Sequence, residues 1–338
     1  DLPRPVDHVL LQADLTAAGQ TASPCSHAFS HAHGDSLRSR HGEALPPIKI
    51  TRHAMKILST LTLSALFVSL TPLAQADVKP DPGDYTALPQ GTDVVVLYQQ
   101  NPRGDNVYSG GKKVADNLDL DLTVGVLRLI HFTEFFNTGL TWDPQIVIPF
   151  GYQKTGATDS KNSGLGDITF GGTVWTIADL AKNEHLGWSV FVTAPTGSEK
   201  NQGFALSNNR WALDFQVGYI KGLTDKITWD VIAETEFYDE QRSTDAKKDP
   251  LLQLHNHLRY NFTPDTYAAI SYRHNWGARE TLDYETLATS RSNGTVGFTV
   301  ATMLGKQVQV LGQLMHDTSV REGVKIDNSL QFRLAYFY

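Results

Sequence analysis

Residues 329–338 read "SLQFRLAYFY", and this stretch decides the fold. Its large apolar side chains fall on every second position: Leu330, Phe332, Leu334, Tyr336 and Tyr338. Gln331, Arg333 and Ala335 lie between them, so a strand here has one apolar face and one polar face. Chain ends are usually polar and frayed. The pattern therefore predicts that these ten residues form a strand held in a sheet.

The same alternation recurs through residues 91–338, with almost no helical period. It predicts twelve strands of about ten residues each. We expect these strands near residues 92–101, 117–130, 140–152, 166–177, 186–196, 209–221, 226–238, 251–263, 266–277, 293–304, 307–317 and 328–338.

The connections between these strands alternate between short and long. Tight turns are indicated by "GLTD" at 222–225, "TPD" at 263–265 and "LGK" at 304–306. The longer polar connections lie at 101–116, 155–164, 196–209, 239–249, 277–292 and 318–327. Outer-membrane barrels have short periplasmic turns, long external loops and an even number of strands, and closure leaves no sheet edge in lipid. We therefore predict an all-β, closed antiparallel transmembrane β-barrel in the bacterial outer membrane.

The two faces of the predicted strands favour a membrane barrel over a soluble one. In residues 209–221, one face carries Trp211 and Phe215, and the other carries Asp214. Residues 226–238 and 251–263 repeat the contrast. A soluble barrel has an apolar interior and a polar outside. Here the charged face is predicted to line the lumen and the apolar face to contact outer-membrane lipid.

Aromatic residues of the apolar face gather near the strand ends. At the turn end they are Trp142, Trp188, Trp229, Tyr219, Phe262 and Tyr338. At the long-loop end they are Tyr98, Phe150, Trp211, Phe237 and Trp276. Aromatic side chains favour strands in general, which explains their number but not this placement. Two belts at the two membrane interfaces are typical of a spanning barrel.

Residues 55–76, "MKILSTLTLSALFVSLTPLAQA", indicate an export signal. Lys56 precedes an apolar run, and Ala74-Gln75-Ala76 forms a small-residue cleavage site. A membrane anchor is the alternative, but the run is shorter than the roughly 20 apolar residues that a spanning helix needs. We expect residues 1–54 to be a disordered, non-native extension from a start site assigned too early. Residues 77–90 would form a periplasmic segment or a lumen plug, and residues 91–338 the barrel.

Composition excludes several classes of function. The chain has 29 Lys and Arg against 36 Asp and Glu, a net charge of −7, and no basic block that would suggest nucleic acid. Its only cysteine, Cys25, lies upstream of the export signal, so the mature chain would have neither a disulfide nor a thiol nucleophile. No βαβ unit surrounds its glycine pairs, so no nucleotide fingerprint is present. We expect no cofactor.

Three stretches carry a resemblance to a known family: "SGLGDITFGGTVW" (163–175), "APTG" (194–197) and "VGYIKGLTDKITWDV" (217–231). They resemble the outer-membrane proteins of the meta-pathway phenol-degradation family over about residues 90–338. The resemblance implies a barrel that transports aromatic compounds. The motifs also have a local explanation, because Gly164 and Gly166 allow a turn and Pro195-Thr196-Gly197 ends a strand.

Two alternatives with catalytic or metal chemistry are weaker. Ser292-Asn293-Gly294 is similar to the Ser-Asn-Gly stretch of outer-membrane phospholipase A, but Ser290 stands where that family has a histidine. A serine without a base is a weak nucleophile. His255 and His257 share one strand face, but two ligands are fewer than the three or four of a usual metal site. We therefore predict no catalytic residue and no metal ligand.

A twelve-stranded barrel is predicted to have a narrow lumen, because about eight strands leave a filled interior and 16–18 leave an open channel. The predicted pore-lining residues are Asp214, Asp230, Glu234, Glu236, His255, His257, Arg259, Arg273 and Arg333. The first hypothesis is passive uptake of small compounds, aromatic ones among them. The alternative is a structural or surface barrel plugged by ion pairs of Arg259 and Arg273 with Glu234 and Glu236.

The expected partners are a small-molecule solute, outer-membrane lipid and the barrel-assembly machinery. The last follows from the final strand, since a C-terminal aromatic residue such as Tyr338 after an alternating pattern resembles the signal that this machinery recognises.

Overall fold

The computed structural model describes residues 79–197 and 206–338. The predictions for residues 1–54 and for the export signal at 55–76 therefore lie outside the described residues. Within the described ranges, no helix is long and apolar enough to cross a membrane. The helical element found there is a short 3-10 turn, η1 (Gly156–Thr158).

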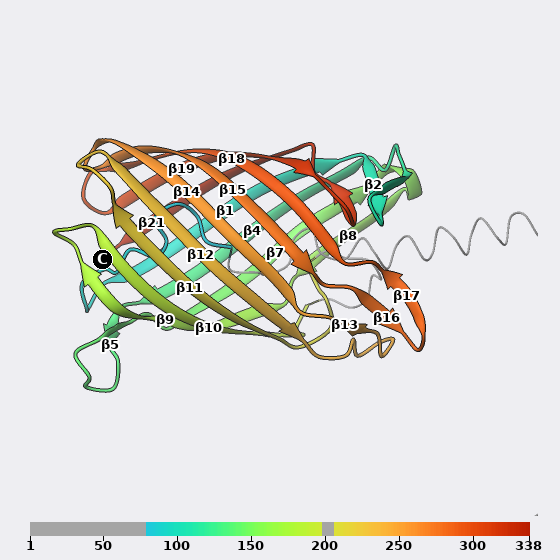
Figure 1. Ribbon diagram of the computed structural model, residues 1–338, viewed down its shortest axis with the longest axis horizontal. Helices are drawn as coiled ribbons and strands as arrows, with labels where there is room; N and C mark the ends of the chain where they lie inside the picture. The colour runs from blue at the N-terminus through green and yellow to red at the C-terminus, as the bar shows by residue number, and fades with distance from the viewer. Residues whose placement is uncertain (1–78, 198–205) are drawn as a thin grey trace, which may run out of the picture. The chain divides into compact units, whose positions relative to one another are not determined.

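Twelve long strands form a closed antiparallel barrel (Figure 1), which confirms the predicted fold class. They are β1 (Asp93–Gly104), β4 (Leu120–His131), β7 (Gln145–Thr155), β9 (Ile168–Asp179), β10 (Glu184–Ala194), β11 (Ala212–Gly222), β12 (Ile227–Tyr238), β14 (Leu251–Thr263), β15 (Thr266–Gly277), β18 (Arg291–Leu304), β19 (Val308–Ser319) and β21 (Asn328–Phe337). Strand β21 pairs with β1 from Phe337 opposite Val94 to Asn328 opposite Arg103. The last strand therefore closes the barrel, as its alternation predicted.

Side chains alternate between the two surfaces of the barrel in the predicted sense. On β12, Asp230 and Glu234 are buried inside, whereas Trp229 is exposed outside. Ile270 on β15 and Phe298 on β18 are exposed by 67% and 53%. Such a wide apolar exterior around a buried polar interior matches the lipid face of an outer-membrane barrel.

The long connections lie at one end of the barrel and carry short strands (Figure 1). One small sheet there contains β2 (Asn106–Ser109), β3 (Lys112–Ala115) and β20 (Gly323–Lys325). A second contains β13 (Lys247–Lys248), β16 (Glu280–Leu282) and β17 (Glu285–Ala288), and β8 (Ser160–Leu165) pairs back on β7.

The opposite end has short turns with one exception. Residues 132–144 form a longer connection with β5 (Thr133–Glu134) and β6 (Thr141–Trp142). Phe135, Phe136 and Trp142 pack together there, with ring centroids 4.8 to 6.1 Å apart. This connection is longer than the predicted tight turns and carries its own aromatic cluster.

Backbone pairing in the barrel wall is shortest between β7 and β9. These strands share three residue pairs, at 145–147 of β7, whereas β4 and β7 share eleven. Pro149 of β7 has no N–H to donate, so it suits the point where a ladder stops. Just beyond it, Leu206 from the connection after β10 is buried against Leu122 and Val124 of β4. The pairing of β7 with β9 ends here, and β7 pairs with β8 beyond it, from Phe150 to Thr155. We call this place the β7–β9 seam.

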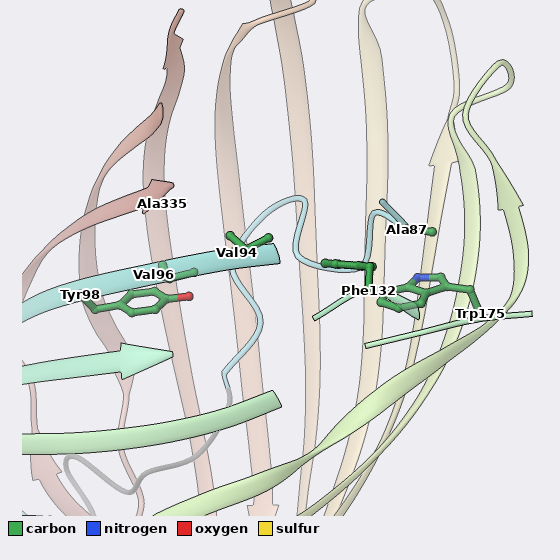
Figure 2. Close-up of a cluster of buried hydrophobic side chains, with 7 residues drawn as sticks. All are labelled: Ala87, Val94, Val96, Tyr98, Phe132, Trp175 and Ala335. Atoms are coloured by element: carbon green, nitrogen blue, oxygen red, sulfur yellow. The ribbon is translucent and has the colours of Figure 1, made fainter. Parts of the chain in front are cut away.

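An apolar cluster fills the lumen where β1 begins (Figure 2). Phe132 and Trp175 stack there, with ring centroids 5.5 Å apart, and Ala87 packs beside them. Tyr98 also belongs to this cluster, so its predicted place in the outer aromatic belt is wrong. It is 9% exposed and faces inward. Residues 94–98 are all apolar, so alternation could not reveal which face of β1 points into the lumen.

Candidate functional site

Residues 79–92, which precede β1, run inside the barrel; we call them the N-terminal segment. Asp81, Tyr85 and Ala87 of this segment are buried. The hydrogen bonds of the segment reach strands on different sides of the wall, from β21 and β4 to β10, β11 and β12. The segment is therefore fixed across the lumen by side chains of the barrel.

Two carboxylates hold one side of the N-terminal segment. Arg333 of β21 donates from Nη1 to Asp84 Oδ1 at 2.7 Å and to Asp81 Oδ2 at 3.2 Å. Arg128 of β4 donates to Asp84 Oδ2 at 3.2 Å. Gln331 adds hydrogen bonds of 2.9 and 3.0 Å to Asp81. All four charged side chains are at most 11% exposed, so this carboxylate anchor is a buried ion-pair network.

The two carboxyl groups of this anchor differ in acidity. Burial raises the pKa of Asp81 to about 6, against the opposing effect of Arg333. Burial acts the same way on Asp84, but Arg333 and Arg128 together outweigh it and lower the pKa of Asp84. Asp84 therefore stays ionised beside the two arginines, whereas burial raises the pKa of Asp81 to about 6.

Tyr85 holds the other side of the segment. Its hydroxyl donates to Gln216 Oε1 at 2.9 Å and lies 2.7 Å from Ser189 Oγ. Its ring packs with Ile220 and Ile232, which are fully buried. Trp175 Nε1 donates to the Tyr85 backbone carbonyl at 3.0 Å. This tyrosine anchor needs no charge, so it is independent of the carboxylates.

A third contact joins the N-terminal segment to two of the predicted pore-lining residues. The Gly83 N–H donates to Asp230 Oδ2 at 2.8 Å. The other oxygen of Asp230 accepts from Arg259 Nη2 and Nε at 2.9 and 3.1 Å. Tyr267 donates to the Pro82 carbonyl at 2.6 Å. Asp230 therefore links a strand-to-strand ion pair to the backbone of the segment.

The nine predicted pore-lining residues all lie on the inner face. All are buried except Arg273, which is half-buried. Their partners differ from the expected pairing, since Arg259 binds Asp230 and Arg273 lies 3.5 Å from Thr295 Oγ1. The other acids and histidines have near neighbours as partners. Two pairs join adjacent strands, His255 with Glu234 at 2.9 Å and His257 with Ser271 at 2.8 Å. Two lie two residues apart on one strand, Gln216 with Asp214 at 2.6 Å and Tyr238 with Glu236 at 2.8 Å.

Between the N-terminal segment and the long loops lies an internal cavity of about 140 Å³. One wall comes from β4 and β7 and is mainly apolar: Val124, Val126, Val147 and Pro149, with the charged Arg128 beside them. The opposite wall is polar and comes from β14, β15 and β18: His255, His257, Ser271, Arg273 and Thr295. Lys79, Pro80 and Asp81 of the segment also line it. The cavity can therefore accept a molecule with one apolar side and one polar side.

Two of the three stretches that carry the family resemblance meet at Asp167. This carboxylate, from the "GLGD" stretch, accepts from the N–H of Gly197 in "APTG" at 2.8 Å. It also accepts from the Asn208 N–H at 2.7 Å and from the Ser207 hydroxyl at 3.2 Å. Burial raises its pKa against these hydrogen bonds. Asp167 thus ties together both flanks of the connection that supplies Leu206 to the seam.

A histidine partner for Ser292 exists, contrary to the expectation that the serine has no base. His274 Nε2 lies 3.1 Å from Ser292 Oγ, and His274 Nδ1 lies 3.1 Å from Tyr272 Oη. The histidine comes from the neighbouring strand β15, so a search along the serine's own strand could not find it. A tyrosine stands where a hydrolase triad has a carboxylate or amide.

In the described part of the chain, no three His, Cys, Asp or Glu side chains are grouped so that they could hold a metal ion. His255 and His257 lie with their rings 6.5 Å apart, and each has a polar neighbour of its own.

Sequence reasoning missed the residues that hold the N-terminal segment: Asp81, Asp84, Tyr85 and Arg128. A signal for one of them existed. Arg128 is the charged residue in the otherwise apolar run "GVLRLI", and a charge within a spanning segment is a functional hypothesis by default. Nothing local distinguishes Tyr85 from any tyrosine in a polar leader.

Comparison with protein families gives a match over most of the barrel. The family described as "Putative MetA-pathway of phenol degradation" matches residues 103–334, which is more than half of the chain. The comparison with curated proteins gave no match.

Among solved structures, the chain is similar to the COG4313 outer-membrane channel from Pseudomonas putida F1. The two are 30% identical, with a TM-score of 0.72, over 77% of this chain and 100% of that one. The NanC porin is 12% identical with a TM-score of 0.41, covering 73% of this chain and 100% of its own. A mutant of the TodX monoaromatic hydrocarbon channel is 7% identical with a TM-score of 0.44, covering 74% and 90%.

Proposed function

The chain belongs to the outer-membrane family of the MetA-pathway of phenol degradation, and on that premise we propose that it is a channel for passive uptake of small amphipathic compounds, aromatic ones among them. The observation that carries this proposal is the two-walled cavity above the N-terminal segment. Its apolar wall suits an aromatic ring, while its polar wall offers hydrogen-bond partners.

In this proposal the N-terminal segment is the restriction that a solute must pass. Its three anchors close the lumen to large solutes, and their loosening opens a path toward the periplasm. Five of the nine predicted residues line the cavity or bind the segment. His255, His257 and Arg273 line the cavity, Arg333 binds Asp81 and Asp84, and Asp230 accepts from the Gly83 N–H. Asp214, Glu234, Glu236 and Arg259 would shape the electrostatic field along the path.

The charged anchor also supports a second candidate function, a plugged structural or surface barrel. Single-channel conductance of the purified protein and uptake by a deletion strain separate the two. The channel predicts measurable conductance and slower uptake of dilute phenol-like compounds when the protein is missing. A silent bilayer together with unchanged uptake of every solute would leave the plugged barrel.

The β7–β9 seam supplies a second way out of the cavity for apolar solutes. Val147 and Pro149 line the cavity and lie at the point where backbone pairing with β9 stops. To leave the barrel through the wall here, an aromatic ring bound on the apolar wall would need to displace side chains. It would not need to break a long series of backbone hydrogen bonds between two strands. We infer that apolar solutes can leave sideways here, whereas ions and polar solutes pass the N-terminal segment.

A further inference from the structure

Tyr85 occupies a socket that is shaped for its ring. Gly187 of β10 and Gly218 of β11 are paired across the two strands, and the ring lies against both. A Cβ atom added at Gly187 would lie 2.9 Å from the ring, and one added at Gly218 would overlap it. Two missing side chains on adjacent strands therefore make room for one aromatic ring. We call this place the tyrosine socket.

The polar end of the socket is set up for a phenolic hydroxyl. Gln216 Oε1 accepts from the Tyr85 hydroxyl at 2.9 Å, and Ser189 Oγ lies 2.7 Å from it. The amide of Gln216 is held in this orientation because its Nε2 donates to Asp214 Oδ2 at 2.6 Å. Ser189 Oγ is in turn 2.9 Å from Thr173 Oγ1. An acceptor and a hydroxyl are thus fixed by barrel residues and do not depend on the N-terminal segment.

We propose that the tyrosine socket is a binding site for a monocyclic phenol, which the protein's own Tyr85 occupies while the N-terminal segment is docked. A 4-alkylphenol has the same ring, the same hydroxyl and the same para carbon as a tyrosine side chain. The two glycines, the Gln216 carbonyl oxygen and the apolar contact with Ile220 and Ile232 would receive it in the same way. This inference deepens the proposed function, because it names the solute class at one place in the lumen.

Occupation by a solute excludes Tyr85, so binding of a phenol and docking of the segment are opposed. A tethered ligand competes at an effective concentration of the order of millimolar. A phenol at millimolar concentration displaces Tyr85 from the tyrosine socket. The N-terminal segment is then released at its tyrosine anchor, while the carboxylate anchor still holds its other side. Release of the segment is then coupled to the arrival of the solute.

The direct test is binding of 4-methylphenol to the purified Tyr85→Ala variant, measured by titration calorimetry. We expect saturable binding of one molecule and weaker binding of 4-methylphenol to the unaltered protein. Toluene should bind at least about tenfold more weakly, because it offers no hydroxyl to Gln216 and Ser189. In the Tyr85→Ala/Gly218→Val double variant the added side chain fills the socket, so binding should disappear.

Several results would overturn the socket. These are no saturable binding to Tyr85→Ala, equal binding of toluene and 4-methylphenol, or unchanged binding after Gly218→Val. If the Tyr85→Ala variant does not form a barrel, the test is the single-channel conductance of the unaltered protein in the presence of each compound. Its conductance should then rise saturably with 4-methylphenol and not with toluene, and a flat response to both refutes the site. Uptake by cells is not needed for either readout, so a failed socket would leave the proposed channel standing.

Discussion

At the scale of single residues, the lumen of this barrel is governed by a few buried groups that reach from the wall to the N-terminal segment. Arg333 is the clearest case, because one guanidinium binds both carboxylates of the segment. The charges cost little only while they are paired, since breaking a buried ion pair costs about 3–5 kcal/mol.

The Arg333→Gln substitution should therefore release the carboxylate anchor. Asp81 and Asp84 would lose their shared partner, and the segment would undock for a larger fraction of the time. We expect higher single-channel conductance than in the unaltered protein. Arg279→Gln is the matched control, since Arg279 forms an exposed ion pair with Asp249, and such pairs contribute little. Equal conductance of both variants would mean that the anchor does not limit the path.

Asp81 predicts a dependence of conductance on pH. Its pKa is about 6 when the segment is docked and 3.8 in an unperturbed aspartate, so the docked state binds the proton more tightly. As the pH falls from about 6 toward 4, the equilibrium between the undocked and the docked segment shifts toward the docked state. Its equilibrium constant rises by up to about tenfold per pH unit. The lowered pKa of Asp84 opposes this only below that window.

We therefore expect conductance to fall between pH 7 and pH 5. The Asp81→Asn variant, which cannot titrate at this position, should show a flatter profile over the same range. A rise in conductance on acidification would contradict the assigned role of Asp81.

At the scale of elements, the strands are regular ladders with one weak join. The β7–β9 seam has three residue pairs. Beyond it β7 pairs with β8 instead of β9, next to Leu206 and the hydrogen bonds that Asp167 accepts. The other strand pairs of the barrel run for eight or more positions. The seam is therefore the place where the wall can open at the lowest cost in backbone hydrogen bonds.

A disulfide across the seam tests this opening. Val147 and Thr169 are the last paired residues, and directly opposed antiparallel positions have Cα separations that a disulfide can span. The Val147→Cys/Thr169→Cys variant, once oxidised, should reduce uptake of apolar aromatic compounds and leave ion conductance unchanged. Thr299→Cys/Gln313→Cys, on the fully paired β18 and β19, is the control. Unchanged uptake with the seam locked would exclude the lateral route.

At the scale of the whole molecule, the barrel is apolar outside and charged within. The stability of the barrel therefore depends on contact between its apolar outer face and the bilayer. Arg at the midplane of a lipid face costs about 2–4 kcal/mol and near an interface about 0–1 kcal/mol. Phe298 in the middle of β18 and Leu304 at its end are both exposed on that face.

Phe298→Arg should therefore lower the free energy of unfolding by about 2–4 kcal/mol, and Leu304→Arg by less than about 1 kcal/mol. Urea unfolding of the protein in lipid vesicles measures both. The same loss for both positions would argue against this depth of insertion.

The orientation of the barrel is tested by single cysteines in a Cys25→Ser background. Ser243 lies in a long connection and Thr224 in a short turn, and both are exposed. An impermeant thiol reagent added to whole cells should label cysteine at Ser243 and not at Thr224. Labelling of the cysteine at position 224 alone would mean that the short turns, and not the long connections, lie outside the cell.

The sequence by itself determined three features: the number of strands, which face of each strand points into the lumen and which points outward, and the closing role of residues 329–338. Alternation and turn chemistry are local, so they can be read from positions two residues apart. The inward position of the seven charged residues and two histidines predicted for the lumen followed from the same alternation. Tyr98 was misplaced because the run of apolar residues at 94–98 has no alternation to read.

Only the tertiary structure decided which side chains meet in the lumen. Asp81 and Arg333 are 252 residues apart, and Tyr85 lies 131 residues from Gln216. Arg259 binds Asp230 rather than Glu234 because strand register, and not charge alone, sets which side chains are neighbours. The anchors of the N-terminal segment, the cavity above it and the short seam all depend on closure of the barrel, which brings distant parts of the chain within hydrogen-bonding distance.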